Sequence, residues 1–265
     1  MSLVNLAAQP DRAFLITDSG YFNPDGTIRE LATKVLLFRE QRVAVSWTSK
    51  GFILPQLAAY LVQDVEPNRL RAMKQDDLIY LFPIWVQRAY ERFGRNPDQD
   101  WSRFSLALWS QKMGGRGLTF STSSASKAGA WVYQPAAVML MPLIPEWSRD
   151  DLLRLTDPLQ FREPEQMMPI IERQCAPDIW KGNGPGGDHI GVAGRIVLTC
   201  LSASGVTSEV LRESSDRIGT LASGLGVVGN EISVPATQDP PVLDAVEMLE
   251  EAAALFEHCG GAQHE

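Results

Sequence analysis

The first fifty residues contain three strings that decide the fold: FLITDS at 14–19, ATKV at 32–35 and VAVSWT at 43–48. They are rich in residues that favour strands, so we expect β-structure here. In this interpretation Asp18 ends one strand and Lys34 begins another. An acid and an amine at adjacent strand ends can lie side by side, where the amine lowers the pKa of the carboxylate and the pair orients a nearby nucleophile. The arrangement is catalytic if the chain supplies a nucleophile.

Turn and helix signals divide the rest of the chain. We expect strands at 3–6, 13–17, 34–38, 42–47, 104–109, 118–121, 131–143, 195–201 and 207–211, with 113–117 as a turn. Helices are expected from 53, from 76 or 77 to 93 with a possible kink at Pro83, and at 164–175. Ser148 and Asp151 resemble a capping box before a further short helix.

Composition narrows the classes of function. The chain has 265 residues, is 45% hydrophobic and carries a formal net charge of −8. Its surface repels phosphate backbones and shows no basic stripe interleaved with aromatic residues, so we expect no nucleic-acid partner. The sequence lacks an uncharged apolar run of about 18 residues, and it lacks the basic and apolar regions of a signal peptide. We therefore expect a soluble, cytoplasmic protein without membrane contact.

Metal and cofactor sites are not predicted. The cysteines Cys175, Cys200 and Cys259 are odd in number and lack CxxC spacing, which argues against a disulfide framework and against a zinc site. Cys200, inside an apolar strand, is expected to be buried and inert. The glycine-rich segment 181–189 lacks the GxxxxGK(S/T) pattern of a phosphate-binding loop, and we interpret His189 as facing solvent.

The order of the expected elements resembles the N-terminal-nucleophile hydrolase fold, and proteasome β-type subunits in particular. The strings ITDS at 16–19, TKV at 33–35 and VSWTS at 45–49 carry this resemblance, together with the glycine-rich segment that leads into RIVLT at 195–199. It covers roughly residues 3–218. The resemblance implies an α+β fold, a four-layer αββα sandwich with two sheets between helix layers, followed here by a C-terminal helical extension.

The spacing of polar residues adds to the resemblance. In that family the nucleophile is an N-terminal Thr, Ser or Cys, an Asp follows sixteen residues later, a Lys sixteen after that, and a strand-to-helix turn with an oxyanion N–H fourteen further on. Here Asp18 follows Ser2 by sixteen, Lys34 follows Asp18 by sixteen, and Thr48 follows Lys34 by fourteen. The family also has an Asp in the turn before its penultimate strand, a place that Asp188 occupies.

These matches imply a chemistry. Removal of Met1 would give Ser2 a free α-amino group, whose ordinary pKa of about 7.7 to 8.0 suits a base for its own hydroxyl. By the resemblance, Asp18 and Lys34 form an ion pair, Lys34 lowers the pKa of the hydroxyl, and the Thr48 N–H stabilises the tetrahedral oxyanion. The implied reaction is hydrolysis of a peptide or small amide, without cofactor or metal.

Each of these residues also has a structural interpretation. Asp18 can bind the turn amides that follow it, Lys34 can be solvated, and Thr48 with its neighbour can cap the first helix. Asp188 can be a residue of a surface loop. The opening Met-Ser-Leu resembles a leader added by cloning, in which case Ser2 is not native and the nucleophile is absent.

Two functions therefore stay open. The first is a hydrolase of amide or peptide bonds built on residues 1–218, followed by a linker at 219–241, an amphipathic helix at 242–258 and a tail at 259–265. That helix can dock on its own domain or on a partner. The second is a catalytically silent, proteasome-like protein that acts through oligomerisation or partner binding. The resemblance implies a homo-oligomer in both cases, because helices of proteasome-like proteins mediate ring stacking.

Overall fold

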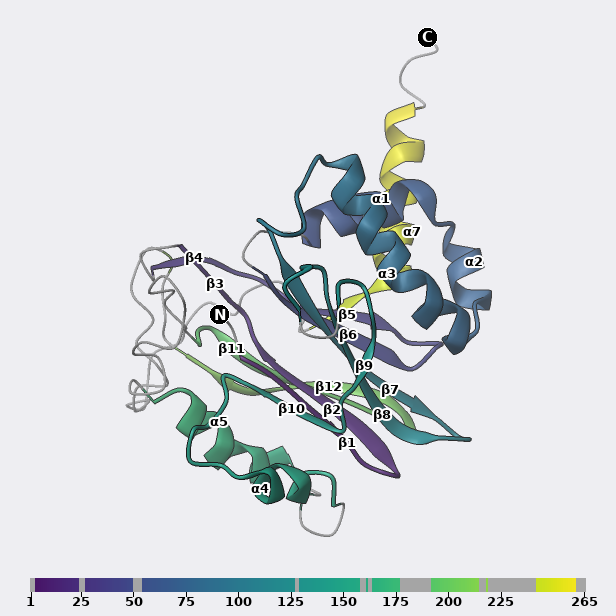
Figure 1. Cartoon of the computed structure of the whole chain (residues 1–265). Coiled ribbons are helices and arrows are strands. Elements are labelled where there is room, and N and C mark those ends of the chain that lie inside the picture. The colour runs from purple at the N-terminus through teal and green to yellow at the C-terminus, as the bar shows by residue number, and fades with distance from the viewer. Residues whose placement is uncertain are drawn as a thin grey trace.

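The computed structural model of the chain describes residues 3–23, 27–49, 54–126, 129–157, 161, 164–176, 192–214, 218 and 242–260 (Figure 1). It contains helices and mainly antiparallel sheets, which confirms the expected α+β class. Four predictions lie wholly or largely outside the described residues: those for Ser2, for the glycine-rich segment with Asp188 and His189, for the 219–241 linker and for the 259–265 tail.

The first sheet is built around the N-terminal hairpin. Within the described residues it has five strands in the order β10-β1-β2-β11-β12. Their bounds are Val138–Met141 for β10, Val4–Ala8 for β1, Arg12–Asp18 for β2, Arg195–Ser202 for β11 and Gly205–Glu213 for β12. The antiparallel register places Thr17 of β2 opposite Val4 of β1 and Val197 of β11. The end of β2, with Asp18, therefore lies beside the beginning of β1.

The second sheet contains the other strands of the opening segment. In the described part of the chain it has six strands in the order β13-β5-β6-β7-β8-β9. Their bounds are Leu243–Asp244 for β13, Val35–Phe38 for β5, Val43–Ser49 for β6, Ser102–Ser110 for β7, Gly114–Ser121 for β8 and Gln134–Pro135 for β9. Neighbouring strands are antiparallel except β13, which runs parallel to β5.

A short hairpin connects the two sheets. It consists of β3, Gly20–Phe22, and β4, Ile28–Leu31. β3 begins two residues after the end of β2, and β4 ends shortly before β5. The backbone N–H of Ala32 donates to the carbonyl of Ser19 at 2.9 Å, which closes the base of the hairpin. The chain therefore leaves the first sheet at Asp18 and enters the second sheet after Lys34.

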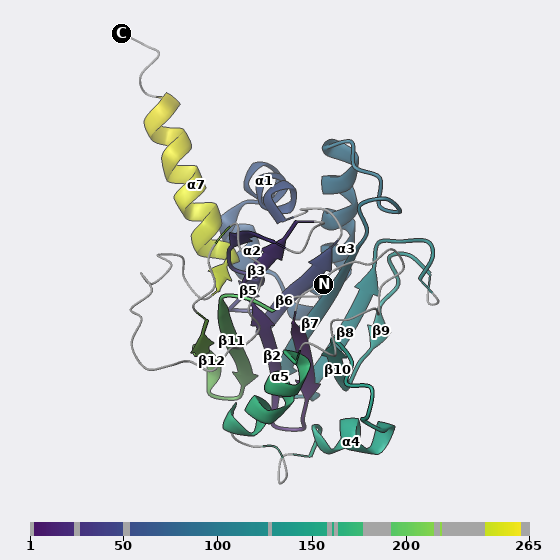
Figure 2. The same ribbon diagram turned by 90° about the vertical axis from the view of Figure 1, so that its left-hand side faces the viewer.

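Helices cover the outer faces of both sheets (Figures 1 and 2). On the second sheet lie α1 (Leu54–Asp64), α2 (Pro67–Ala72), α3 (Gln75–Arg92) and α7 (Ala245–Gly260). On the first sheet lie α4 (Arg149–Arg154), the 3-10 turn η1 (Pro164–Met167) and α5 (Met168–Gln174). Ser148 and Asp151 form the expected capping box at the start of α4.

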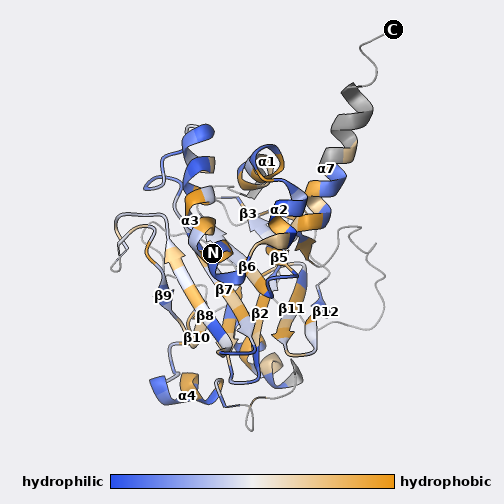
Figure 3. Cartoon of the chain, turned by 90° about the vertical axis from the view of Figure 1, so that its right-hand side faces the viewer, coloured by the Kyte–Doolittle hydropathy of each residue, from blue (hydrophilic) through white to orange (hydrophobic). Residues whose placement is uncertain are grey.

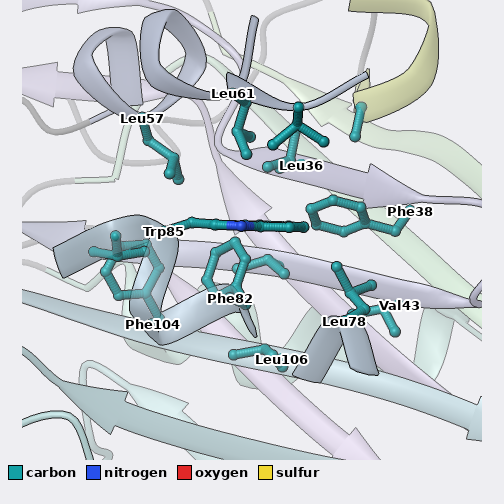
Figure 4. Packing of buried hydrophobic residues seen from close by; sticks show 14 of the residues in the cluster. Leu36, Phe38, Val43, Leu57, Leu61, Leu78, Phe82, Trp85, Phe104 and Leu106 are labelled. Carbon is teal, nitrogen blue, oxygen red and sulfur yellow. The ribbon is translucent and has the colours of Figure 1, made fainter. Parts of the chain in front are cut away.

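Three apolar clusters follow from the alternation of side chains along the strands. Val45 and Trp47 of β6 belong to the cluster on the helix side of the second sheet. Phe82 and Trp85 of α3 pack in the same cluster (Figure 4). Ala44 of the same strand belongs instead to the cluster between the sheets. A third cluster joins the first sheet to α5. In Figure 3 much of the hydrophobic sequence, in orange, lies on the strands, whereas one end of α3 is hydrophilic, in blue. The two sheets thus pack face to face through an apolar interior.

The C-terminal helix docks on its own domain. Ala245, Val246 and Leu249 are buried in the cluster between the second sheet and its helices. Arg71 of α2 binds Glu250 of α7 at 2.7 Å. The structure therefore supports the first of the two placements that the amphipathic pattern allowed. The helix begins later than expected, because Leu243–Asp244 form β13.

Two expectations for the middle of the chain are wrong. Residues 114–117 belong to strand β8 and not to a turn. A Cβ at Gly115 would strike the backbone of Arg12, and a Cβ at Gly117 would strike the backbone of Ala136. These glycines allow close approach between chain segments. The apolar segment 131–143 is not one strand either: β9 joins the second sheet and β10 the first.

Candidate functional site

Asp18 and Lys34 form a buried ion pair that joins the two sheets. Asp18 is the last residue of β2, and Lys34 directly precedes β5. Lys34 Nζ donates to Asp18 Oδ1 at 2.8 Å, and the two side chains are 1% and 0% exposed. The alternative interpretation of Lys34 as a solvated residue is therefore wrong. The β3–β4 hairpin brings the two residues together, since it carries the chain from one sheet to the other.

The Asp18 carboxylate accepts four hydrogen bonds from donors in the described residues. Oδ1 accepts from Lys34 Nζ and from the backbone N–H of Leu3 at 2.9 Å. Oδ2 accepts from the backbone N–H groups of Gly20, at 3.1 Å, and Ala193, at 3.3 Å. Asp18 thus binds the turn amide that the structural interpretation anticipated, and it also fixes the beginning of β1 and the segment before β11. Donors on both oxygens stabilise the ionised form.

Lys34 is enclosed by the segment that follows Asp18. Its ammonium donates to Asp18 Oδ1 and to the carbonyl of Gly20, and it lies 4.9 Å from the centre of the Tyr21 ring. Burial lowers the pKa of Lys34 below its ordinary value, and the charge and hydrogen bond of Asp18 oppose this shift. Burial likewise raises the pKa of Asp18, opposed by Lys34 and the backbone N–H groups. Each charge therefore depends on its partner.

Two glycines allow the chain to pack tightly around the ion pair. A Cβ at Gly20 would lie 2.8 Å from the Ala193 Cβ and 3.2 Å from Asp18 Oδ2. Gly194 has a φ of +74°, and a Cβ there would strike Ser19 Oγ. Ser19 Oγ in turn accepts from the Arg195 N–H at 2.9 Å. The start of β11 is therefore held against the end of β2.

Thr48 lies within strand β6 and does not cap the first helix. The strand runs through Ser49, and α1 begins only at Leu54, so this expectation is wrong. By the alternation along β6, the side chains of Ser46 and Thr48 face the interior between the sheets, as Ala44 does. Both hydroxyl groups are buried without a hydrogen-bond partner in the described part of the chain.

The register of β5 and β6 places these hydroxyl groups near the ion pair. Ser46 is opposite Val35, the neighbour of Lys34 in the chain. Thr48 lies two residues further along β6, toward the same end of the sheet. No sequence pattern predicts that Ser46 lies near the ion pair, whereas the Asp-Ser-Gly string at 18–20 predicts the contact of Asp18 with the Gly20 amide. The intervals between the predicted site residues do not indicate Tyr21.

Two of the predicted site residues are not placed. Ser2 and Asp188 lie outside the described residues. The nearest described neighbour of Ser2 is Leu3, whose nitrogen is bonded to the Ser2 carbonyl carbon and donates to Asp18. Of the predicted residues, the structure therefore brings Asp18 and Lys34 into contact, with Thr48 on the neighbouring strand.

Other kinds of site have little support. In the ranges that the structure describes, no three His, Cys, Asp or Glu side chains are grouped to hold a metal ion. No helix among the described residues has the length and apolar character to cross a membrane. Burial raises the pKa of Cys200 to about 11, in keeping with an unreactive thiol, although its side chain is half-buried and not fully buried as expected.

A cavity of about 430 Å³ lies elsewhere, between α2 and α3, and shares no residue with the ion pair.

Comparisons with protein-family models and with curated proteins find no match to this chain. The functional interpretation therefore rests on the geometry around Asp18 and Lys34.

Proposed function

We propose that the chain is an N-terminal-nucleophile hydrolase that cleaves an amide or peptide bond. The two sheets with helices on their outer faces are the arrangement that an αββα sandwich of this class requires. One observation carries the proposal: Asp18 Oδ1 accepts simultaneously from Lys34 Nζ and from the Leu3 N–H. The ion pair thus holds Leu3, the residue that follows Ser2 in the sequence and directly precedes β1.

The burial of the ion pair supports a chemical role. Two charges removed from water cost several kcal/mol, and apolar residues of similar volume often replace such a pair without loss of stability. The pair is therefore weakly explained by stability alone. A cation beside a hydroxyl group favours its ionised form, which is what a serine nucleophile requires.

The proposed reaction has two stages. After removal of Met1, the Ser2 α-amino group takes the proton of the Ser2 hydroxyl, and Oγ bonds to the carbonyl carbon of the substrate. The tetrahedral intermediate collapses as the carbon–nitrogen bond breaks, and the amine leaves with that proton. Water then hydrolyses the serine ester, which releases the acid and restores Ser2. Lys34 stabilises the developing negative charge on Oγ, and the Thr48 N–H and Asp188 are proposed to support the intermediate.

Hydrolysis of a library of peptide amides by the natural protein tests this proposal. Intact mass must first show loss of Met1, since the base is the free α-amino group. Turnover should then disappear in Ser2→Ala and persist in Ser204→Ala, which removes an exposed hydroxyl. Equal turnover in wild type and Ser2→Ala, or a natural N-terminus without Ser, Thr or Cys, would reject the assignment.

The second candidate is a silent protein that assembles with further copies of itself. Tyr80 on α3 is 72% exposed and lines the cavity between α2 and α3 together with Met73 and Leu81. Exposed aromatic residues beside a cavity are typical of contact surfaces. Light scattering tests this candidate, with Tyr80→Ser expected to lower the measured mass. A monomeric wild-type protein would remove its support.

A further inference from the structure

We propose that Tyr21 is a positioning residue, whose ring holds the Lys34 ammonium in contact with Asp18. The inference rests on the proposed function for its chemical meaning, because Lys34 is the group that acts on the nucleophile. Tyr21 itself touches no reacting atom in this proposal. It acts through Lys34, and its position was not indicated by the spacing of the site residues.

The geometry around the ammonium carries the proposal. Lys34 Nζ lies 4.9 Å from the centre of the Tyr21 ring, within the distance at which a cation is attracted to an aromatic face. Within the described residues, the ammonium donates hydrogen bonds to Asp18 Oδ1 and to the Gly20 carbonyl. The ring therefore supplies a third favourable contact to a charge whose side chain is only 1% exposed. Such contacts are strongest where water is excluded.

The backbone explains why Tyr21 occupies this position. Gly20 donates its N–H to Asp18 Oδ2 and accepts from Lys34 Nζ, so the residue before Tyr21 is fixed to both members of the ion pair. On the other strand of the hairpin, Tyr21 is paired with Glu30. The Tyr21 hydroxyl lies 3.5 Å from the carbonyl of Thr33, the residue before Lys34. The ring is thus held over the lysine from both sides.

The charged groups near the Tyr21–Lys34 contact determine how a change in the Lys34 pKa is interpreted. Asp18 on β2 is the charge that acts on Lys34. Asp18, with Arg29 and Glu30 on β4, acts on Tyr21, whose own pKa is raised chiefly by burial. Tyr21 therefore stays neutral as Lys34 titrates. A change in its ring alters the attraction to the ammonium without adding or removing a charge.

The test is an NMR titration of Lys34 in protein labelled at the lysine side-chain carbon and nitrogen atoms, with the signal assigned through Lys34→Met. In Tyr21→Leu we expect the Lys34 midpoint to move to lower pH, by about a tenfold fall in the protonation constant. Tyr21→Phe keeps the ring and should leave the midpoint within about twofold of wild type. An unchanged midpoint in Tyr21→Leu would overturn the proposal, as would equal shifts in the Leu and Phe variants.

A second comparison covers the case in which Tyr21→Leu does not fold. Phenylalanine and trifluorophenylalanine at position 21 have nearly the same shape, but fluorine weakens the negative face of the ring. The fluorinated protein should have the lower midpoint, and equal midpoints would contradict the role of the ring. These titrations need no turnover. A protein without hydrolase activity but with the expected shifts would refute the proposed function and keep the role of Tyr21.

Discussion

Among the buried polar contacts that link layers in the described residues, two pairs of side chains differ in charge. Asn5 of β1 and Gln174 of α5 exchange hydrogen bonds of 2.6 and 2.9 Å, which join the first sheet to its helix. Asp18 and Lys34 join the first sheet to the second at 2.8 Å. The amide pair is neutral and links the layers without the cost of burying a charge. The ion pair performs a similar linking task with two charges, which points to a role beyond packing.

The largest effect is expected from Lys34→Met. This change leaves the Asp18 carboxylate buried without its cation, and we predict a loss of about 3 to 5 kcal/mol in the free energy of unfolding. Denaturant unfolding measures it, with Lys112→Met as the control for an exposed lysine. Adding Asp18→Asn should recover part of the loss. Losses that simply add in the double variant would show that the two residues act independently.

The pH dependence of the stability of Lys34→Met follows from the direction in which the Asp18 pKa is shifted. Burial raises its pKa above the ordinary value of 3.8, and removal of Lys34 takes away the main opposing charge. A raised pKa in the folded state means that the folded protein favours the protonated acid. The Lys34→Met variant should therefore lose least stability at acidic pH, and more as the pH rises through the raised pKa. Unfolding at a series of pH values checks this, and a constant loss would contradict it.

Gly20→Ala should have the next largest effect on the free energy of unfolding. It crowds the ion pair with an added Cβ and leaves both charges in place. The added Cβ would lie 2.8 Å from Ala193 Cβ and 3.2 Å from Asp18 Oδ2. We predict a loss of about 2 to 3 kcal/mol by thermal or denaturant unfolding. Gly94→Ala is the control, since nothing lies within 4 Å of a Cβ there and only its φ of +59° opposes the change. Equal losses in both variants would remove the crowding explanation.

Asn5→Ala tests the neutral contact. It leaves the Gln174 amide without its reciprocal partner, and we predict a loss of about 1 to 2 kcal/mol. Because neither side chain titrates, the loss should be the same at pH 5 and pH 9 in denaturant unfolding. A loss that changed with pH as that of Lys34→Met does would erase the distinction between the two contacts.

The smallest effect is expected at the surface. The pKa of Asp151 is lowered by hydrogen bonds from the Ser148 side chain and backbone, so its ionised form stabilises the start of α4. A lowered pKa contributes stability above the ordinary value of 3.8, and this is lost as the pH falls through the folded-state value. Asp151→Asn should therefore lower the melting temperature slightly at pH 7 and by less at pH 2. A larger effect at pH 2 would contradict this.

Much of the fold could be predicted because its elements carry local signals. Short apolar runs rich in strand-favouring residues indicated β1, β2, β5 and β6, and the Ser148–Asp151 pattern indicated the cap of α4. The division of 131–143 between two sheets could not be predicted, since strand pairing is decided by tertiary contacts. Gly115 and Gly117 were misinterpreted for a related reason: a glycine required by close packing has the same local signal as a glycine in a turn.

The site was predictable to a smaller extent. The interval of sixteen residues from Asp18 to Lys34 indicated their contact through the family resemblance. Among the other donors to Asp18, the Gly20 N–H is indicated by the Asp-Ser-Gly string, whereas the backbone N–H groups of Leu3 and Ala193 have no side-chain pattern that indicates them. Tyr21 was missed because a strand aromatic is ordinarily core packing, and its contact with Lys34 depends on the path of the β3–β4 hairpin.

The most direct measurement of the central claim is the identification of the residue that reacts with an electrophile. A peptide bearing a hydroxyl-reactive group is incubated with the natural protein, and the adduct is located by mass spectrometry of its fragments. We predict one adduct, on the Ser2 hydroxyl of chains that have lost Met1, formed much more slowly in folded Lys34→Met and at the normal rate in Lys112→Met. An adduct on another residue, or equal rates in both lysine variants, would contradict the claim that the buried ion pair activates the N-terminal serine.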